Sequence, residues 1–372
     1  MGFSSWNNFG DNINETLFKQ VIDSMDRNGL REAGFVYVNL DDGWQRYKGD
    51  RKDHPLEADP VKFPSGIKAL ADYAHGKGFK LGIYNGPGET TCAGYTGSAN
   101  HEAEDAAMFA SWGIDHLKYD ACCSHENAPQ EEVKNFITHV IADGPIFGSG
   151  LLQWVQINGG LVKTLVTISI TLETVRSISL MSWICWIEGT TSLNTLAQGI
   201  GMIMILMLIV GLNGQSSQLL GTGASDVEYR SHFSLWAMAT SPLLIGADAR
   251  TLSTETLETL MNKEVIELSQ DLMGAAAEVV REEPGDGGTL QVYAKEMSDG
   301  SYAVALLNRG SSTAEMSVSP RRDLTIDWDT YRLRDLWKHE DHGPYDITYT
   351  TEVMSHEAKV LRLYPITNGS ST

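Results

Sequence analysis

Apolar residues along the chain alternate between helical spacing and short continuous runs. Residues 15–34 carry an apolar stripe at helical spacing, and residues 35–40 form a continuous apolar run directly after it. The same order returns with a helix predicted after residues 63–66, a strand over 80–84, a helix over 102–112 and a strand over 114–119. This alternation indicates a parallel barrel or a doubly wound sheet, and polar residues at the strand ends favour the barrel.

The pattern changes in the last quarter of the chain. Apolar segments over 229–240, 242–246 and 253–261 still repeat the order of helix, strand and helix. Past residue 275, Gly, Asp and Ser turns separate apolar runs at 290–294, 301–307 and 358–363. We therefore predict a barrel domain over residues 1–275 and a C-terminal antiparallel β-sandwich over 276–372, a division that suits a chain of 372 residues.

One predicted strand ends in a carboxylate placed as a nucleophile would be. Asp120 closes the apolar run over 114–119, with Lys118 two positions before it and Cys122 two positions after it. In barrel enzymes the carboxyl ends of the strands carry the reacting groups. Asp120 is therefore the candidate nucleophile.

A pair of carboxylates closes the run over 35–40. Asp41 and Asp42 are followed by Gly43 and Trp44. A turn at the strand end would explain this composition by itself, because Asp and Gly favour turns. Carboxylates at the mouth of a barrel would also bind a ligand that supplies hydroxyl donors. The residues alone leave both interpretations open.

The charge of the chain restricts its partners. The formal net charge is -20 and the sequence pI is about 4.8, so the surface repels nucleic acid and anionic membrane. The sequence contains no metal-ligand spacing, no glycine loop for phosphate and no basic stripe, so we expect no cofactor and no metal. A neutral or cationic partner is favoured, and the 9 Trp and 13 Tyr suit either core packing or stacking on sugars.

Cysteines and sequons bear on the compartment. Cys122 and Cys123 are adjacent and cannot sensibly pair with each other. Asparagine sequons occur at Asn14 and Asn368, consistent with an oxidising secretory route. The chain opens directly on a predicted structural motif rather than on a signal peptide. We therefore expect a mature, glycosylated form that is secreted or lysosomal or vacuolar.

Several motifs occur together in the order in which one enzyme family carries them. They are MGFSSWN from Met1, VNLDDGW from Val38, KLGIY from Lys80, TCAGY from Thr91, LKYD from Leu117 and SPLLIG from Ser241. In these motifs the chain resembles the α-galactosidases (melibiases) of glycoside hydrolase family 27. The resemblance implies a (β/α)8 TIM barrel followed by a β-sandwich. It also implies a retaining hydrolase that removes terminal α-linked galactose from oligosaccharides or glycoconjugates.

The resemblance also implies roles for individual residues. Asp120 would be the nucleophile that forms a covalent glycosyl-enzyme intermediate, and Lys118 would hold the sugar and help to keep Asp120 ionised. Asp41 and Asp42 would accept hydrogen bonds from galactose hydroxyl groups. The remaining implied contributions are a pocket wall from Trp6 and Tyr84, a substrate contact from Gln153, and a disulfide between Cys92 and Cys122.

The chain departs from the family at two places that matter for function. Gln153 stands where relatives often carry glutamate, so galactose and N-acetylgalactosamine are not distinguished and an α-N-acetylgalactosaminidase is an alternative. The family's acid/base, expected downstream of Trp154 in an arginine and aspartate motif, has no counterpart. A catalytically silent galactoside-binding homologue is therefore a second alternative, and the oligomeric state is not predicted.

The missing motif coincides with an anomalous segment over 155–206. No aspartate occurs between Asp143 and Asp226, and the only acids there are Glu173 and Glu188. A membrane span is disfavoured, because the unbroken apolar run 203–210 is shorter than the ~20 residues that a bilayer requires. The segment is then either an unusual part of the barrel or a translation in a shifted reading frame.

We favour the shifted frame because the sequence tests it internally. In the shifted frame, each codon consists of the third base of one residue's codon and the first two bases of the next residue's codon. Read in this way, the Trp186/Ile187 and Met202/Ile203 junctions must each encode aspartate. The shifted reading of residues 186–203 permits a sequence close to the AGPG-WNDPDML motif of the family. The shift does not identify the acid/base, which stays unassigned.

Overall fold

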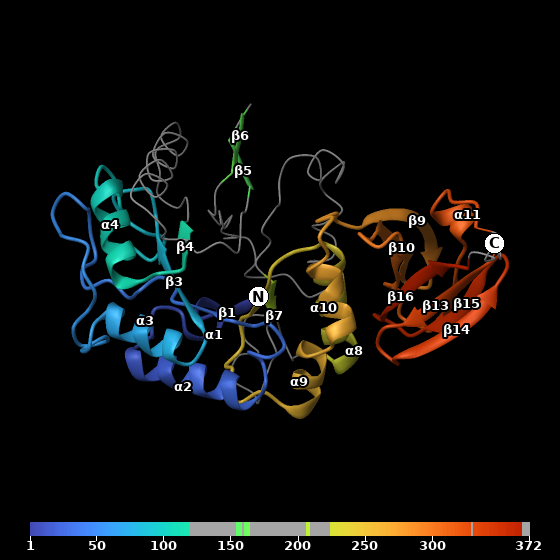
Figure 1. Ribbon diagram of the computed structural model, residues 1–372, viewed down its shortest axis with the longest axis horizontal. Helices are drawn as coiled ribbons and strands as arrows, with labels where there is room; N and C mark the ends of the chain where they lie inside the picture. The colour runs from blue at the N-terminus through green and yellow to red at the C-terminus, as the bar shows by residue number, and fades with distance from the viewer. Residues whose placement is uncertain (120–153, 158–159, 164–205, 209–223, 329, 367–372) are drawn as a thin grey trace, which may run out of the picture. The chain divides into compact units, whose positions relative to one another are not determined.

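The computed structural model describes residues 1–119, 154–157, 160–163, 206–208, 224–328 and 330–366 (Figure 1). These residues belong to two compact units. The first unit contains the N-terminal strands and helices with β7 and β8, and the second contains α8 to α10 and the C-terminal strands.

The first unit is built on a parallel sheet whose strands run in the order β4-β3-β2-β1-β8-β7. Strand β1 pairs in parallel with both β2 and β8, so the first strand of the chain joins a late strand to the second one. This neighbour relation is that of a barrel, in which the last strand returns to the first. The strands are β1 (Gly2–Ser4), β2 (Tyr37–Asn39), β3 (Lys80–Asn85), β4 (His116–Tyr119), β7 (Leu206–Leu208) and β8 (Leu243–Ile245).

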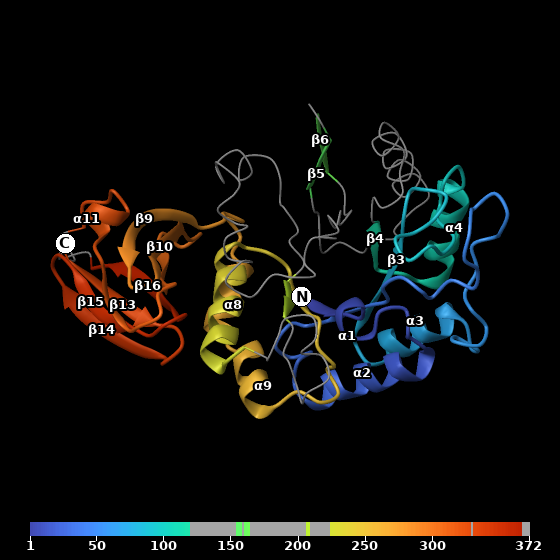
Figure 2. The ribbon, with the colours of Figure 1, turned by 180° about the vertical axis from the view of Figure 1, so that it is seen from behind.

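The helices of this unit agree with the predicted alternation. They are α1 (Trp6–Phe9), α2 (Glu15–Arg27), α3 (Ile67–Gly76) and α4 (Glu102–Trp112), and α2 and α3 lie side by side (Figures 1 and 2). Helix α3 buries Ile67, Leu70, Ala71 and Ala74, the face predicted from the apolar spacing. The predicted helix over 15–34 is shorter than expected. It ends at Arg27 because Gly29 takes a positive φ of 79° and starts the turns that lead into β2.

A short antiparallel pair forms a separate two-stranded sheet in the described residues. Strands β5 (Trp154–Ile157) and β6 (Gly160–Lys163) pair with each other and with no strand of the parallel sheet in the described residues. The pair falls at the start of the anomalous segment 155–206. Most of that segment lies outside the described residues.

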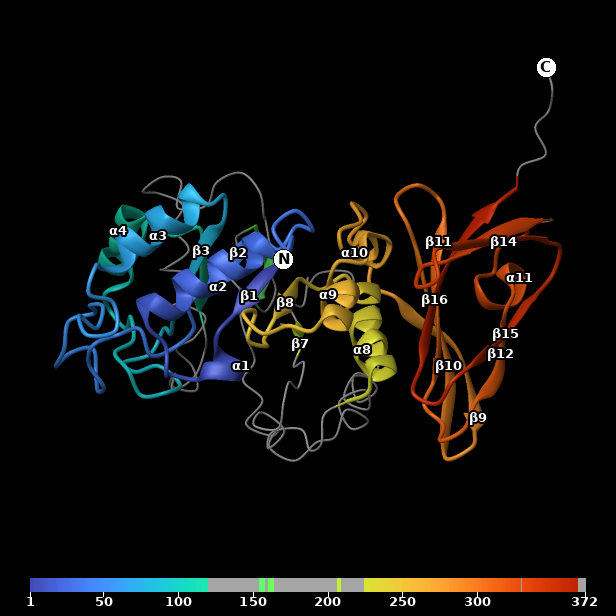
Figure 3. The same ribbon diagram turned by 90° about the horizontal axis from the view of Figure 1, so that it is seen from below.

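The second unit contains an antiparallel sandwich. One sheet has the order β14-β13-β16-β11-β10-β9, and β12 pairs with β15 in a second sheet (Figure 3). Val304, Leu306, Leu361, Met316 and Val353 pack between them in one apolar cluster. The strands are β9 (Glu278–Gly285), β10 (Gly288–Glu296), β11 (Tyr302–Asn308), β12 (Ala314–Val318), β13 (Tyr331–Asp335), β14 (Glu340–Tyr345), β15 (Tyr349–Val353) and β16 (Ala358–Pro365).

Three helices that the sequence assigned to the barrel domain belong to the same compact unit as this sandwich. They are α8 (Asp226–Met238), α9 (Thr254–Leu260) and α10 (Lys263–Ser269), while α11 (Pro320–Asp323) lies within the sandwich itself. Helix α8 packs against β16 and β11. The predicted boundary between residues 275 and 276 stays a prediction, and compact packing groups these helices with the sandwich.

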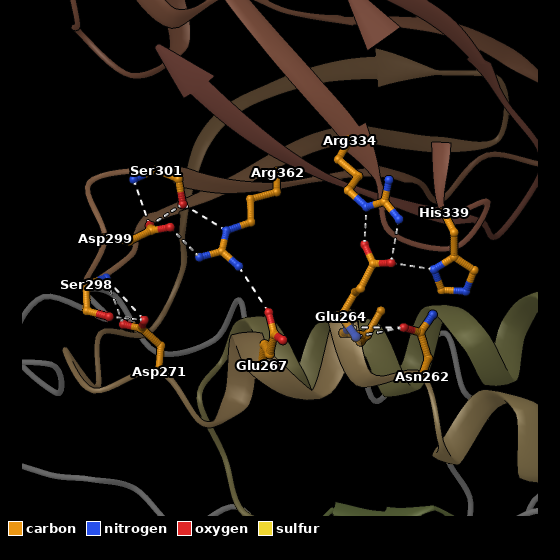
Figure 4. Close-up of polar contacts among 11 residues, drawn as sticks. Asn262, Glu264, Glu267, Asp271, Ser298, Asp299, Ser301, Arg334, His339 and Arg362 are labelled. Atoms are coloured by element: carbon orange, nitrogen blue, oxygen red, sulfur yellow. Dashed lines mark hydrogen bonds and ion pairs between the residues drawn. The ribbon is translucent and has the colours of Figure 1, made fainter. Parts of the chain in front are cut away.

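Ion pairs connect α10 to strands of the sandwich (Figure 4). Glu264 accepts from the Arg334 guanidinium at 2.6 and 2.9 Å and contacts His339 Nδ1 at 2.7 Å. The Arg334 contact, followed by His339, holds the pKa of Glu264 below its usual value against partial burial. The Arg362 guanidinium donates to Glu267 Oε2 at 3.3 Å and to Asp299 Oδ2 at 2.9 Å. The helix is thus linked to β13 and β16 by two separate arginines.

A buried lysine makes a second connection in this unit. Lys295 of β10 donates through Nζ to the Leu268 carbonyl and to Thr240 Oγ1, both at 2.6 Å. Leu268 lies in the last turn of α10, whose free carbonyl groups favour a cation. Burial lowers the pKa of Lys295 to about 8. The ammonium group therefore satisfies helix-end carbonyls from inside the sheet.

Candidate active site

The candidate site lies where the first four strands of the parallel sheet end. The register places Ser4 beside Asn39, Asn39 beside Gly82, and Gly82 beside His116. Gly82 is required there, because a Cβ atom would lie 1.9 Å from Asn39 Oδ1. Since alternate residues of a strand face the same side, the next layer toward the carboxyl ends contains Asp41, Tyr84 and Lys118.

Asp41 and Lys118 form a buried ion pair across this layer. Lys118 Nζ lies 2.9 Å from Asp41 Oδ2, and the two side chains are 12% and 4% exposed. The Asp41 N–H donates to Ser5 Oγ at 3.1 Å, which fixes the backbone that carries the carboxylate. Lys118 Nζ also lies 5.0 Å from the centre of the Tyr84 ring. Sequence reasoning selected Asp41, Tyr84 and Lys118, and the structure brings these three together.

Asp42 faces a different set of partners. Its carboxylate accepts from Thr91 Oγ1 at 2.9 Å, from the Ala93 N–H at 2.8 Å and from the Gly43 N–H at 2.9 Å. Burial raises the pKa of Asp42 to about 6, although these donors act in the opposite direction. In the sequence, Thr91 is notable only as the first residue of the TCAGY motif. No local spacing indicates its contact with a carboxylate 49 positions away.

Tyr84 and Cys92 connect the site to the loop that follows β3. Trp44 Nε1 donates to the Tyr84 carbonyl at 2.7 Å, and the Tyr84 hydroxyl donates to Cys92 Sγ at 3.0 Å. Cys92 is disulfide-bonded. The other cysteines, among them the predicted partner Cys122, lie outside the described residues, so the pairing stays a prediction.

Other predicted site residues are placed less completely. Trp6 is half-buried at the start of α1, directly after the Ser5 that binds Asp41. Asn14 is exposed and caps α2, with its Oδ1 accepting from the Leu17 N–H at 2.9 Å. Asp120 and Gln153 lie outside the described residues, as does the sequon at Asn368. Their predicted roles are therefore not tested by the geometry.

His116 is a half-buried group that the motifs and strand-end carboxylates of the sequence did not point to. It precedes Lys118 by two positions on β4, so the two residues belong to the same face of the sheet. Burial lowers the pKa of His116 to about 4, which keeps the imidazole neutral near the adjacent cations. The alternation His116, Lys118, Asp120 is visible in the sequence and could have identified it.

Two kinds of site are absent from the described part of the chain. No group of three or more His, Cys, Asp or Glu residues there is arranged to bind a metal ion. No helix there combines the length and the hydrophobicity that crossing a membrane requires.

Comparison with known proteins assigns the family. The family model described as Alpha galactosidase A matches residues 5–145, and the model of the Alpha galactosidase C-terminal beta sandwich domain matches residues 287–363. Alpha-galactosidase 2 of Arabidopsis thaliana is 37% identical over 369 residues, covering 98% of this chain and 88% of the relative. The chain belongs to the α-galactosidases of glycoside hydrolase family 27. The predicted family, barrel and sandwich are thereby confirmed.

Further relatives of this α-galactosidase family support the same assignment. Alpha-galactosidase A of Cellvibrio japonicus is 33% identical over 397 residues, covering 98% of this chain and 91% of the relative. The crystal structure of alpha-galactosidase I from Mortierella vinacea superposes with a TM-score of 0.75 at 25% identity, covering 98% of this chain and 96% of that one. The α-galactosidase assignment therefore extends over nearly the whole chain.

Proposed function

We propose that the chain is a retaining glycoside hydrolase that removes terminal α-linked galactose, with Asp120 as its nucleophile. The observation that carries this proposal is the Asp41–Lys118 pair at the carboxyl ends of β2 and β4. A carboxylate held by a lysine at a strand end presents both an acceptor and donors to a sugar. Family membership supplies the reaction class.

The described residues have distinct roles in this proposal. Asp41 and Asp42 accept hydrogen bonds from the sugar hydroxyl groups, and Lys118 donates to the sugar. Trp6 and Tyr84 form the wall of the pocket, with Gln153 as a further contact. Asp120 follows Lys118 by two positions, so continued alternation would direct both toward the same sugar. Attack by its carboxylate on the anomeric carbon would expel the leaving group and form the glycosyl-enzyme intermediate.

The proposal requires an acid/base that segment 155–206 does not supply. Two observations support a shifted reading frame there: the match to the catalytic-domain model ends at residue 145, and β5 pairs only with β6 in the described sheets. We expect resequencing of the coding DNA to find compensating frame errors near residues 155 and 206. Unchanged reads across both points would show that the segment is genuine.

An activated substrate tests the reaction independently of the acid. Dinitrophenolate leaves without protonation, so 2,4-dinitrophenyl α-galactoside should be cleaved even where the acid is missing, whereas methyl α-galactoside requires it. Proton NMR should show α-galactose as the first product, because two displacements retain the configuration. β-Galactose as the first product would contradict the mechanism. Binding without release would indicate the silent galactoside-binding homologue.

The sugar preference follows from the same assay. Comparing α-galactoside with the matching N-acetyl-α-galactosaminide distinguishes the α-galactosidase from the α-N-acetylgalactosaminidase alternative. Galactose-containing carbohydrate is the proposed partner, and neither nucleic acid nor membrane is proposed.

We also propose a cellular compartment for the protein. A disulfide at Cys92 and an exposed sequon at Asn14 support a secreted, lysosomal or vacuolar glycoprotein. The Cys92–Cys122 pairing and a glycan at Asn14 are parts of this proposal. Peptide mapping before and after reduction tests the first, and enzymatic deglycosylation tests the second.

A further inference from the structure

The Asp42 carboxylate accepts hydrogen bonds from one hydroxyl group and two backbone N–H groups. Thr91 Oγ1 and the Gly43 N–H donate to Oδ1, and the Ala93 N–H donates to Oδ2, at 2.8 to 2.9 Å. Asp42 itself is 1% exposed. Donors favour the charged form of a carboxyl group, whereas burial favours the neutral form. The charge on Asp42 therefore depends on these three contacts.

The Thr91 hydroxyl is oriented by a turn in the loop after β3. The Tyr95 N–H donates to Thr91 Oγ1 at 3.0 Å, and the Thr91 N–H donates to the Tyr95 carbonyl at 2.7 Å. A hydroxyl group has one proton, and here the contact with Asp42 uses it. The Tyr95 hydroxyl donates to Asp11 Oδ2 at 3.0 Å, which anchors the turn to a second loop. Thr91 is thus fixed as a donor toward Asp42.

We propose that Thr91, together with the Ala93 N–H, is a positioning residue that keeps Asp42 charged and oriented as an acceptor for the sugar hydroxyl groups. This inference rests on the proposed function, in which Asp42 binds galactose. Thr91 acts through Asp42 and is not itself a catalytic residue.

The surrounding charges define the expected pH dependence. Burial, followed by the neighbouring Asp41 carboxylate, raises the pKa of Asp42 to about 6, and the donations from Ala93 and Thr91 oppose that rise. Tyr95 stays neutral because burial and Asp11 raise its pKa to about 12. Lys62, on the following loop, donates through Nζ to the Gly43 carbonyl at 2.7 Å and to the Asp11 carbonyl at 2.9 Å. Galactose affinity should therefore fall as the pH falls through about 6.

Removing the Thr91 hydroxyl donor should move the loss of galactose affinity to higher pH. In Thr91→Val the carboxylate loses a hydrogen bond, so its pKa rises and protonation begins at a higher pH. Galactose binding measured by calorimetry between pH 4.5 and 8 should show the midpoint of the loss shifted upward by about one pH unit. Thr91→Ser, which keeps the hydroxyl, should restore the wild-type profile.

A matched control lies on the same loop. Thr96 is as buried as Thr91, but its hydroxyl donates to the Tyr47 carbonyl at 3.3 Å rather than to a carboxylate. Thr96→Val should therefore leave the midpoint unchanged, whatever it does to stability. Equal shifts in the Thr91 and Thr96 variants, or no shift in either, would overturn the inference.

A direct titration separates this inference from the proposed function. Carbon-13 NMR of protein labelled at the aspartate carboxyl groups, with Asp42→Asn assigning the signal, reports the pKa of Asp42 without any sugar. An upward shift in Thr91→Val supports the positioning role even if galactose does not bind, a result that would count against the proposed function alone. An unchanged pKa would reject the role. Thr91→Ala gives the same test if the valine variant does not fold.

Discussion

An Asp120→Asn variant is expected to release dinitrophenolate from the activated α-galactoside on the order of 10⁴-fold more slowly than the wild type. The amide has nearly the shape of the carboxylate but is a poor nucleophile, so the glycosyl-enzyme bond cannot form. The effect should fall on kcat, because the sugar contacts of Asp41 and Lys118 are retained. Stopped-flow and steady-state rates on the same substrate measure it.

The control for Asp120→Asn is the same substitution at the other end of the strand. Asp115 precedes β4, and its Oδ2 accepts from the Leu81 N–H at 2.9 Å and contacts His75 Nε2 at 2.7 Å. Asp115→Asn should lower the melting temperature and leave kcat unchanged. A fluorinated galactosyl substrate with a good leaving group should label the peptide that contains Asp120. A label on another carboxylate would reject Asp120 as the nucleophile.

Lys118→Met is expected to reduce both stability and sugar binding. It leaves the Asp41 carboxylate, 4% exposed, without its cation. Breaking a buried pair from one side costs about 3–5 kcal/mol of the free energy of unfolding, because the remaining charge stays desolvated. Galactose should bind about 100-fold more weakly, since one hydrogen bond to a charged group contributes about 1.5–3 kcal/mol. Urea unfolding and calorimetry measure the two effects.

Lys80→Met provides the comparison for Lys118→Met. Lys80 lies on the adjacent strand β3 with Nζ 5.3 Å from the centre of the Tyr37 ring, the same kind of contact that Lys118 makes with Tyr84 at 5.0 Å. Both variants therefore lose a lysine that is stacked on a tyrosine, whereas only Lys118→Met loses the ion pair with Asp41. We expect Lys80→Met to leave galactose affinity unchanged. Equal losses of affinity in both would show that the Asp41 pair does not bind the sugar.

Much of the local structure was predictable from periodicity. The apolar face of α3, the extent of α4 and the strand that ends before Asp41 all followed from the spacing of apolar residues. Helix α2 was predicted too long, because apolar residues after Gly29 continue the helical spacing although the backbone has turned. Spacing reports which side chains are buried, not where the chain changes direction.

The candidate site was predictable in its residues but not in its contacts. Asp41, Tyr84 and Lys118 each stand at or near the end of a predicted strand, and the sequence identified all three. Their pairing depends on strand order and register, which bring Lys118 to a carboxylate 77 positions away. The donation from Thr91 to Asp42 depends on the fold of a loop, for which the sequence has no periodic pattern.

The sequence by itself determined the alternation of helices and strands, the strand-end carboxylates and the family, because these depend on residue identity and short spacing. Only the tertiary structure decided which partners surround each charge: Lys118 for Asp41, three donors for Asp42, and helix-end carbonyls for Lys295. The physical reason is that burial makes an unpaired charge costly, so its partners are selected by proximity in the folded chain. Proximity between distant segments is set by topology and register.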